Sequence, residues 1–229
     1  MVDIGGEATN PWASAISIDE EWRRLEPILK IVLPKYGERI SLDTRHPEII
    51  KRALGYGPFI LNDVTGFSDP AMVQIAAENR LHVIASHLPL VAKGDIQLAH
   101  TTIRMSSTEE VASELLKIRT NLLRAHIHAS NIVLDPGIGF GKSMQCNWQL
   151  LKISKQLQLE GQTIMIGASR KRMLATDSET GQDIPGADKT EVARSLEAAK
   201  IAIEACRETN NPLWLRVHDV AAHVALLAD

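Results

Sequence analysis

Polar side chains follow several short apolar runs of the sequence, at the points where strands of a parallel sheet would end. Asp43, Asn62 and Asp135 are carboxylate or carboxamide residues of this kind. Carboxylates accept hydrogen bonds from ring N–H and amino groups, and a carboxamide both donates and accepts, so the three suit the edge of a nitrogen-rich heterocycle. The alternative is that each residue caps the helix or turn that follows it. Three such residues at successive strand ends favour a shared binding site.

Cationic side chains follow two further apolar runs. The segment Gly167–Lys171 places a hydroxyl group and two cations after a strand, and Lys171 could contact a heterocycle oxygen or an anionic substrate. Arg216 and His218 alternate along the last strand, so both side chains point to the same face. Because the guanidinium fork matches phosphate oxygens, this pair predicts a pyrophosphate clamp. The alternatives are an exposed basic turn for the first group and an ion-paired arginine for the second.

A glycine-rich segment, Asp135–Lys142, begins at another strand end and contains the aromatic residue Phe140. Its glycines allow the backbone to approach a ligand closely, and a phosphate cradle is one option. The segment lacks the glycine spacing of a Walker loop and of a dinucleotide-binding fingerprint. As a glycine loop alone, it does not identify the ligand.

The elements that must position these residues alternate between short β-branched runs and longer segments of helical periodicity, which is typical of βα units around a parallel sheet. The predicted strands cover residues 1–4, 38–42, 58–61, 82–85, 131–134, 163–166 and 212–217. The predicted helices cover residues 19–34, 47–55, 69–79, 107–128, 146–158, 190–208 and 219–228. Ser107 with Glu110 predicts a capping box, and Pro47 and Pro70 are suited to first helical turns. The polar segments 86–106 and 173–189 are expected to be active-site loops.

These units predict an α/β fold, a TIM (β/α)8-type barrel that forms a single domain over residues 1–229. A closed barrel requires eight strands, whereas the sequence supplies seven units and begins inside the first predicted strand. We therefore expect the first βα unit to be missing, with Met1 an internal methionine of a longer reading frame.

The composition of the chain argues against nucleic acid and membranes as binding partners. A net charge of -3 and a pI of about 6.2 provide no basic field for nucleic acid or an anionic membrane. No stretch reaches the roughly 18 apolar residues of a membrane span, and no signal peptide is recognisable. Cys146 and Cys206 lack metal-ligand spacing and suit a reducing compartment, so we expect a cytoplasmic protein.

Read together, the motifs resemble the dihydropteroate synthase family over nearly the whole chain. The blocks that carry the resemblance are Asp3–Pro11, Ile40–Thr44, Leu61–Asp63, Asp135–Lys142, Gly167–Lys171 and Arg216–Asp219. Each block alone is weak, but their joint occurrence in the family's order is specific. The resemblance implies a transferase of folate biosynthesis that joins 6-hydroxymethyl-7,8-dihydropterin pyrophosphate to para-aminobenzoate and releases pyrophosphate.

The resemblance also implies roles for individual residues. The residues implied to bind the pterin are Asp43, Asn62, Asp135 and Lys171. Arg216 and His218 are implied to bind the pyrophosphate and, with Lys171, to be the catalytic residues. Those implied to border the para-aminobenzoate pocket are Thr9, Phe140 and Ser169. The family further implies Mg²⁺ as cofactor and a homodimer formed through the last helices. The reaction requires stabilisation of leaving-group charge and a preorganised pterin more than a general base.

Three departures from the family pattern affect this expectation. The family's first strand and its Asn-Val-Thr-Pro-Asp-Ser-Phe-Ser-Asp loop, whose asparagine binds the metal, are absent, so no metal ligand is expected in this chain. Ala8 and Asn10 replace a serine and an arginine of the family's next loop. Cys146-Asn147 stands where the family often has His-Asn.

Two other functions are compatible with these motifs. An impaired or non-catalytic homologue would bind the pterin without releasing pyrophosphate, and the missing metal loop together with Asn10 motivates that alternative. A pterin-dependent methyltransferase domain would share the barrel and the Asp/Asn contacts. Such a domain would not be expected to retain Lys171 and Arg216 in their blocks.

Overall fold

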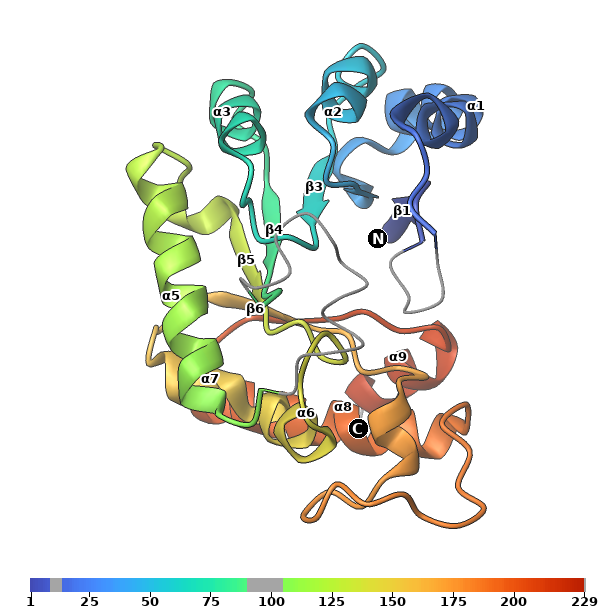
Figure 1. Ribbon diagram of the computed structural model, residues 1–229, viewed down its shortest axis with the longest axis vertical. Coiled ribbons are helices and arrows are strands. Elements are labelled where there is room, and N and C mark those ends of the chain that lie inside the picture. The colour runs from blue at the N-terminus through green and yellow to red at the C-terminus, as the bar shows by residue number, and fades with distance from the viewer. Residues whose placement is uncertain (9–13, 90–104, 229) are drawn as a thin grey trace.

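Seven parallel strands form one sheet in the order of the chain, β1-β2-β3-β4-β5-β6-β7 (Figure 1). The computed structural model describes residues 1–8, 14–89 and 105–228. The strands are β1 (Val2–Gly5), β2 (Ile40–Asp43), β3 (Ile60–Asp63), β4 (Val83–Ser86), β5 (Ile132–Asp135), β6 (Thr163–Ile166) and β7 (Leu213–Leu215). The predicted βα pattern and its α/β class are confirmed.

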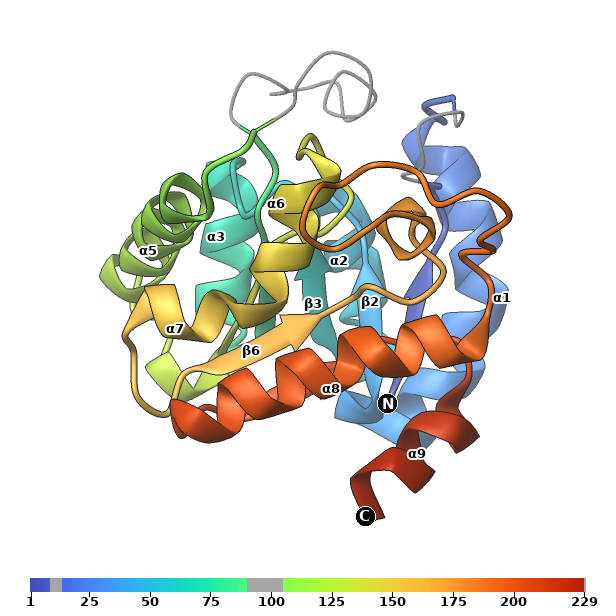
Figure 2. The ribbon, with the colours of Figure 1, turned by 90° about the horizontal axis from the view of Figure 1, so that it is seen from below.

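Helices follow the strands and form the outer layer of the molecule, with α5, α7 and α8 visible outside the sheet in Figure 2. They are α1 (Ile18–Tyr36), α2 (Pro47–Ala53), α3 (Pro70–Glu78), α5 (Thr108–Arg124), α6 (Met144–Gln149), α7 (Ile153–Leu157), α8 (Val192–Glu208) and α9 (Val220–Ala228). Ser107 caps α5 by accepting from the Glu110 amide at 3.0 Å, and Pro47 and Pro70 occupy first turns as predicted.

The single helix predicted over 146–158 is wrong in two respects. The helix begins earlier, because the Ser143 hydroxyl accepts from the Cys146 amide and caps α6. It is also divided by a 3-10 turn over Leu150–Lys152, where Lys152 adopts φ -105° and ψ 21°. The division leaves Leu150, Leu151 and Ile153 all buried in the core.

The two faces of the sheet bury different cores. Leucine, isoleucine and alanine side chains of the helices pack on the outer face. On the inner face, Ile60, Ile84, Val133 and Met165 form a small apolar layer against Trp214. Because side chains alternate along a strand, residues two positions further along each strand point to the same inner side, nearer its carboxyl end. This alternation places polar residues directly next to the apolar layer, at the carboxyl ends of the strands.

Strands β1 and β7 are the two edges of the sheet, and within the described residues no pairing joins them. This arrangement agrees with seven strands of a barrel type that closes with eight. Across residues 1–8, 14–89 and 105–228, no helix has the length and apolarity needed to cross a membrane.

Candidate active site

A ring of polar side chains lies directly above the apolar layer of the inner face. Asp43 is two residues beyond Ser41 in β2, Asn62 two beyond Ile60 in β3, and Asp135 two beyond Val133 in β5. The register places Asp43 beside Asn62, so two of the predicted residues are immediate neighbours. The three predicted heterocycle-binding residues therefore share one face of the sheet.

Arg216 connects the ring across the sheet. Its Nη1 lies 3.3 Å from an Asp3 oxygen and its Nη2 lies 3.3 Å from an Asp135 oxygen. Burial opposes the positive charge, but the carboxylates of Asp135, Asp3 and Asp43 outweigh that effect and raise the pKa of Arg216. A Cβ at Gly167 would lie 3.0 Å from the Arg216 Nε, so a larger residue there would force the guanidinium to shift.

Asp3 is a further member of this ring, and no role in the site was predicted for it from the sequence. Asn62 Nδ2 donates to both Asp3 oxygens, at 3.2 and 3.3 Å, and Arg216 binds the same carboxylate. The sequence places Asp3 in the first predicted strand, but only the structural register, which pairs Asp3 with Ser41, shows that it shares the face of Asp43.

Asn62 has an unused acceptor. The residue is 2% exposed, its amide nitrogen is engaged with Asp3, and its buried Oδ1 has no hydrogen-bond partner among residues 1–8, 14–89 and 105–228. Leaving a buried acceptor unsatisfied costs about 1–3 kcal/mol. A ligand N–H placed against this oxygen would remove that cost, so Asn62 is set up to read a donor on a bound molecule.

The surroundings of Asp43 favour its protonated form. Burial and the nearby Asp3 carboxylate raise the pKa of Asp43 to about 8, against the opposing attraction of Arg216. The neutral carboxyl group both donates and accepts, whereas the ionised form only accepts. Asp43 can therefore complement either a donor or an acceptor on a heterocycle, depending on pH.

Lys171 lies over the glycine-rich segment. Its Nζ donates to the carbonyl of Ile138 and lies 4.9 Å from the centroid of the Phe140 ring. Burial, followed by the nearby Arg216 charge, lowers the pKa of Lys171 to about 8. The structure thus brings together Lys171 and Phe140, which the resemblance assigns to the two different substrates.

His218 and Ser169 form a second predicted pair that the structure joins. The Ser169 hydroxyl lies 3.0 Å from His218 Nδ1, and the His218 backbone amide donates to the same hydroxyl at 3.4 Å. Ser169 therefore orients the imidazole and leaves Nε2 as the ring nitrogen for another partner. Thr9, the remaining predicted residue, lies outside the described residues.

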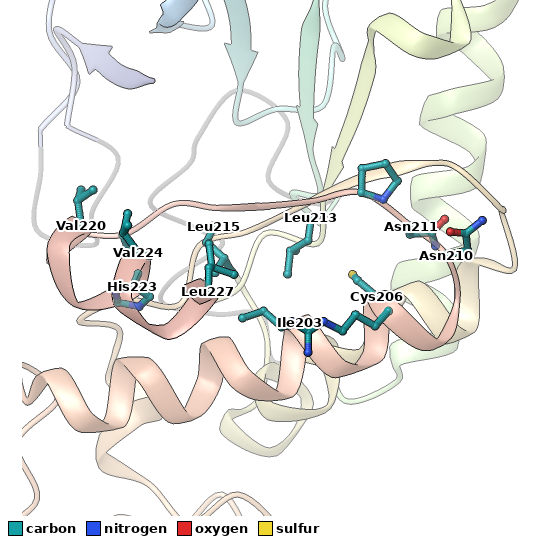
Figure 3. A pocket seen from close by; sticks show the side chains of 13 residues that line it. Ile203, Cys206, Asn210, Asn211, Leu213, Leu215, Val220, His223, Val224 and Leu227 are labelled. Carbon is teal, nitrogen blue, oxygen red and sulfur yellow. The ribbon is translucent and has the colours of Figure 1, made fainter. Parts of the chain in front are cut away.

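A groove on the outside of the sheet is a separate feature. It has a volume of about 630 Å³ and is lined by residues of α8, β7 and α9, among them Ile203, Leu215 and Val224 (Figure 3). None of the inner-face residues described above contributes to its lining. The groove is predominantly apolar and is not the candidate site.

Comparison with known proteins places the chain in a family. A family model described as pterin binding enzyme matches residues 1–218. Dihydropteroate synthase of Mycobacterium leprae is 34% identical over 99% of this chain and 78% of its own length. The chain belongs to the dihydropteroate synthase family.

Solved structures of dihydropteroate synthases have the same fold. The Thermus thermophilus enzyme in complex with 4-aminobenzoate matches with a TM-score of 0.78 and 34% identity, covering 99% of this chain and 82% of that one. The Burkholderia cenocepacia enzyme complexed with 7,8-dihydropteroate matches with a TM-score of 0.81 and 31% identity, covering 99% and 79%.

The chain spans different shares of its relatives. A probable bifunctional folylpolyglutamate synthase/dihydropteroate synthase of Haloferax volcanii is 32% identical over 98% of this chain but only 25% of its own length. The chain therefore spans about a quarter of the length of the Haloferax volcanii relative and about three quarters of that of the Mycobacterium leprae relative.

Proposed function

We propose that this chain is the catalytic domain of a dihydropteroate synthase. It would join 6-hydroxymethyl-7,8-dihydropterin pyrophosphate to para-aminobenzoate and release pyrophosphate, a step of folate biosynthesis. The observation that carries the proposal is the inner-face ring, in which Asn62 is the strand neighbour of Asp43 and its Oδ1 has no partner within the described part of the chain. Such a ring of carboxyl and carboxamide groups complements the alternating donors and acceptors of a pterin.

In the proposed complex, Asp43, Asn62 and Asp135 read the polar edge of the pterin. The Asn62 oxygen accepts from a ring or amino N–H, and the Asp135 carboxylate, which already accepts from the Gly137 amide at 2.8 Å, is held in a fixed orientation. Lys171 keeps the carbonyl of Ile138 and uses another N–H to donate to an oxygen of the pterin. The ring is preorganised, so little conformational entropy is lost when the pterin binds.

Arg216 and His218 are proposed to bind the departing pyrophosphate. Negative charge grows on the leaving oxygens as the bond to the pterin methylene breaks, and a guanidinium with an oriented imidazole stabilises that charge. Arg216 lies 3.3 Å from both of its carboxylate partners, distances long enough for it to exchange them for phosphate oxygens. Each tenfold gain in rate requires about 1.4 kcal/mol of such preferential stabilisation of the transition state.

The arylamine is proposed to attack from the side of Phe140, Ser169 and Thr9. The Phe140 ring already packs against the Lys171 ammonium, so it can border both substrates. Attack by the neutral amine nitrogen forms the C–N bond while the C–O bond to pyrophosphate breaks, and the nitrogen then loses a proton. The step needs orientation and charge stabilisation from the protein, with no protein nucleophile.

Magnesium enters this proposal through the family resemblance. Across the part of the chain that the structure describes, no group of three or more His, Cys, Asp or Glu residues could hold a metal ion. Asp3 and Asp135 are also engaged with Arg216. These residues do not fit a resident Mg²⁺ ion, so the steps above use only side chains of this chain.

A homodimer and a cytoplasmic location complete the proposal. Val220, Val224 and Leu227 of α9 are 61%, 59% and 56% exposed and recur at helical spacing, which supports a second copy as the partner of this face. Cys146 and Cys206 are buried free thiols, as a reducing compartment permits. Sedimentation velocity on the chain and on a Val224→Glu variant would test the dimer, which the variant should dissociate.

The decisive experiment measures pyrophosphate release by this chain with both substrates and magnesium, and pterin binding in parallel. Release that depends on para-aminobenzoate is the expected result. Binding without release would instead support the impaired homologue, which the replacement of a family arginine by Asn10 motivates. Absence of both binding and release in a folded sample would contradict the proposal.

A further inference from the structure

Lys142 is a buried lysine whose amino group binds backbone carbonyls of the protein. Its side chain is 2% exposed, and its Nζ donates to the carbonyls of Phe140 at 2.9 Å, Gly137 at 3.0 Å and His87 at 3.3 Å. An ammonium group has three N–H bonds, so these carbonyls account for all of them. Burial lowers the pKa of Lys142 to about 7, as expected where three neutral carbonyls replace water.

The same loop supplies a carbonyl to the second lysine. Between Gly137 and Phe140, the two loop residues whose carbonyls accept from Lys142, the carbonyl of Ile138 accepts from Lys171. The Lys171 ammonium also lies over the Phe140 ring. The loop follows this path because Gly137 has a φ of +63°, and a Cβ there would lie only 2.1 Å from the His87 oxygen. The glycine-rich loop therefore divides its carbonyls between Lys142 and Lys171.

Asn147 of α6 also fixes the loop through its side-chain amide. Its Oδ1 accepts from the Gly139 amide at 2.7 Å, and its Nδ2 donates to the Lys142 carbonyl at 3.5 Å. The Gly137 amide is similarly taken by an Asp135 oxygen at 2.8 Å. Both glycine amides are thus occupied by side-chain oxygens, which argues against a phosphate cradle made from these groups.

We propose that Lys142, together with Asn147, is a positioning residue for Lys171. By holding the carbonyls on either side of Ile138, Lys142 fixes both the oxygen that retains Lys171 and the ring over which it lies. The inference rests on the proposed function, because Lys171 is taken as the lysine that contacts the pterin. Neither Lys142 nor Asn147 is required to touch a substrate.

A double-mutant cycle tests this relationship. Calorimetric titration with 6-hydroxymethyl-7,8-dihydropterin pyrophosphate, without para-aminobenzoate, gives the Kd of the wild type and of Lys142→Met, Lys171→Gln and the double variant. Lys142→Met should raise the Kd at least tenfold in the wild-type background but less than threefold in the Lys171→Gln background. Lys152→Met, which changes an exposed lysine on the neighbouring 3-10 turn, should leave the Kd within twofold.

Each outcome decides a different point. An equal effect of Lys142→Met in both backgrounds, or a change within twofold, would overturn the positioning role while leaving Lys171 as the pterin lysine. If Lys171→Gln alone leaves the Kd within twofold, the proposed role of Lys171 is wrong and the inference falls with it. Should Lys142→Met fail to fold by far-UV circular dichroism, the same cycle with Asn147→Ala replaces it, and the same coupling is expected.

Discussion

Replacing Asn62 by aspartate tests the electrostatics of the inner-face ring. Asn62 Nδ2 lies 3.2 Å from an Asp3 oxygen, so Asn62→Asp puts a second carboxylate where a donor stood. Two unit charges at that distance repel by about 5 kcal/mol at an effective dielectric constant of about 20. Arg216 lies 3.3 Å from Asp3 and offsets part of this repulsion. It offsets only part because it also forms an ion pair with Asp135.

Protonation is the alternative to repulsion, and its cost depends on pH. A carboxyl group with an ordinary pKa of about 4 takes up a proton at pH 8 at a cost of about 5 kcal/mol, and at pH 5 at a cost of about 1.4 kcal/mol. The variant can therefore avoid the repulsion at pH 5 but not at pH 8. We expect its loss of stability, relative to wild type, to be at least about 2 kcal/mol larger at pH 8 than at pH 5.

Urea denaturation of wild type, Asn62→Asp and Asn62→Leu at both pH values measures the effect. The leucine variant is the control, because it loses the same hydrogen bonds to Asp3 without adding a charge. Its loss of stability relative to wild type should be nearly the same at the two pH values. Equal losses for Asn62→Asp at pH 5 and pH 8 would show that position 62 does not face Asp3, and the ring as described would be wrong.

Three further predictions concern the same site. Lys171→Ala or Arg216→Ala should reduce substrate binding or turnover at least tenfold, about 1.4 kcal/mol, in titrations and pyrophosphate-release assays; unchanged values in both variants would refute their roles. The folded-state pKa of Asp43 is raised to about 8, so its contribution to stability is present at low pH and is lost as pH rises from about 4 to 8, by at most about 1.4 kcal/mol per pH unit. Denaturation series at pH 5 to 8 should show this slope in wild type and a shallower one in Asp43→Asn. Ser169→Ala removes the 3.0 Å partner of His218 and should raise the KM for the pterin pyrophosphate about two- to tenfold, whereas an unchanged KM would separate the hydroxyl from the clamp.

Much of the fold was predictable because the local residue pattern of many segments matches the element that each one forms in the folded protein. The strand predicted over residues 163–166 is β6, Thr163–Ile166, since its β-branched apolar run is bounded by Gly161 and Gly167. The helix predicted over 146–158 failed because its division at Leu150–Lys152 serves tertiary burial, which periodicity does not record.

Within the site, the sequence predicted which residues lie at strand ends but not which of them form ion pairs with one another. Asp43, Asn62 and Asp135 were predicted to share a binding site because each follows a strand, and the structure places all three on one face of the sheet. The ion pairs of Arg216 join residues separated by 213 and 81 positions, so neither pair is visible in any local pattern. The sequence offered an ion-paired arginine and a pyrophosphate clamp as alternatives. The structure shows the ion pairs, and the clamp remains a prediction for the liganded protein.

The glycine-rich loop shows which kind of information a motif lacks. Three glycines indicate a backbone that is folded tightly, yet they do not say whether amide or carbonyl groups face the site. In an anion cradle the amides must be free to donate, but Asp135 and Asn147 already accept from two of them. The carbonyls face Lys142 and Lys171 instead, so the loop holds cations in place. A loop that binds lysine side chains with its backbone carbonyls can support pterin recognition only through the lysine that it positions. The coupling between Lys142 and Lys171 in the double-mutant cycle therefore distinguishes this role from simple structural support.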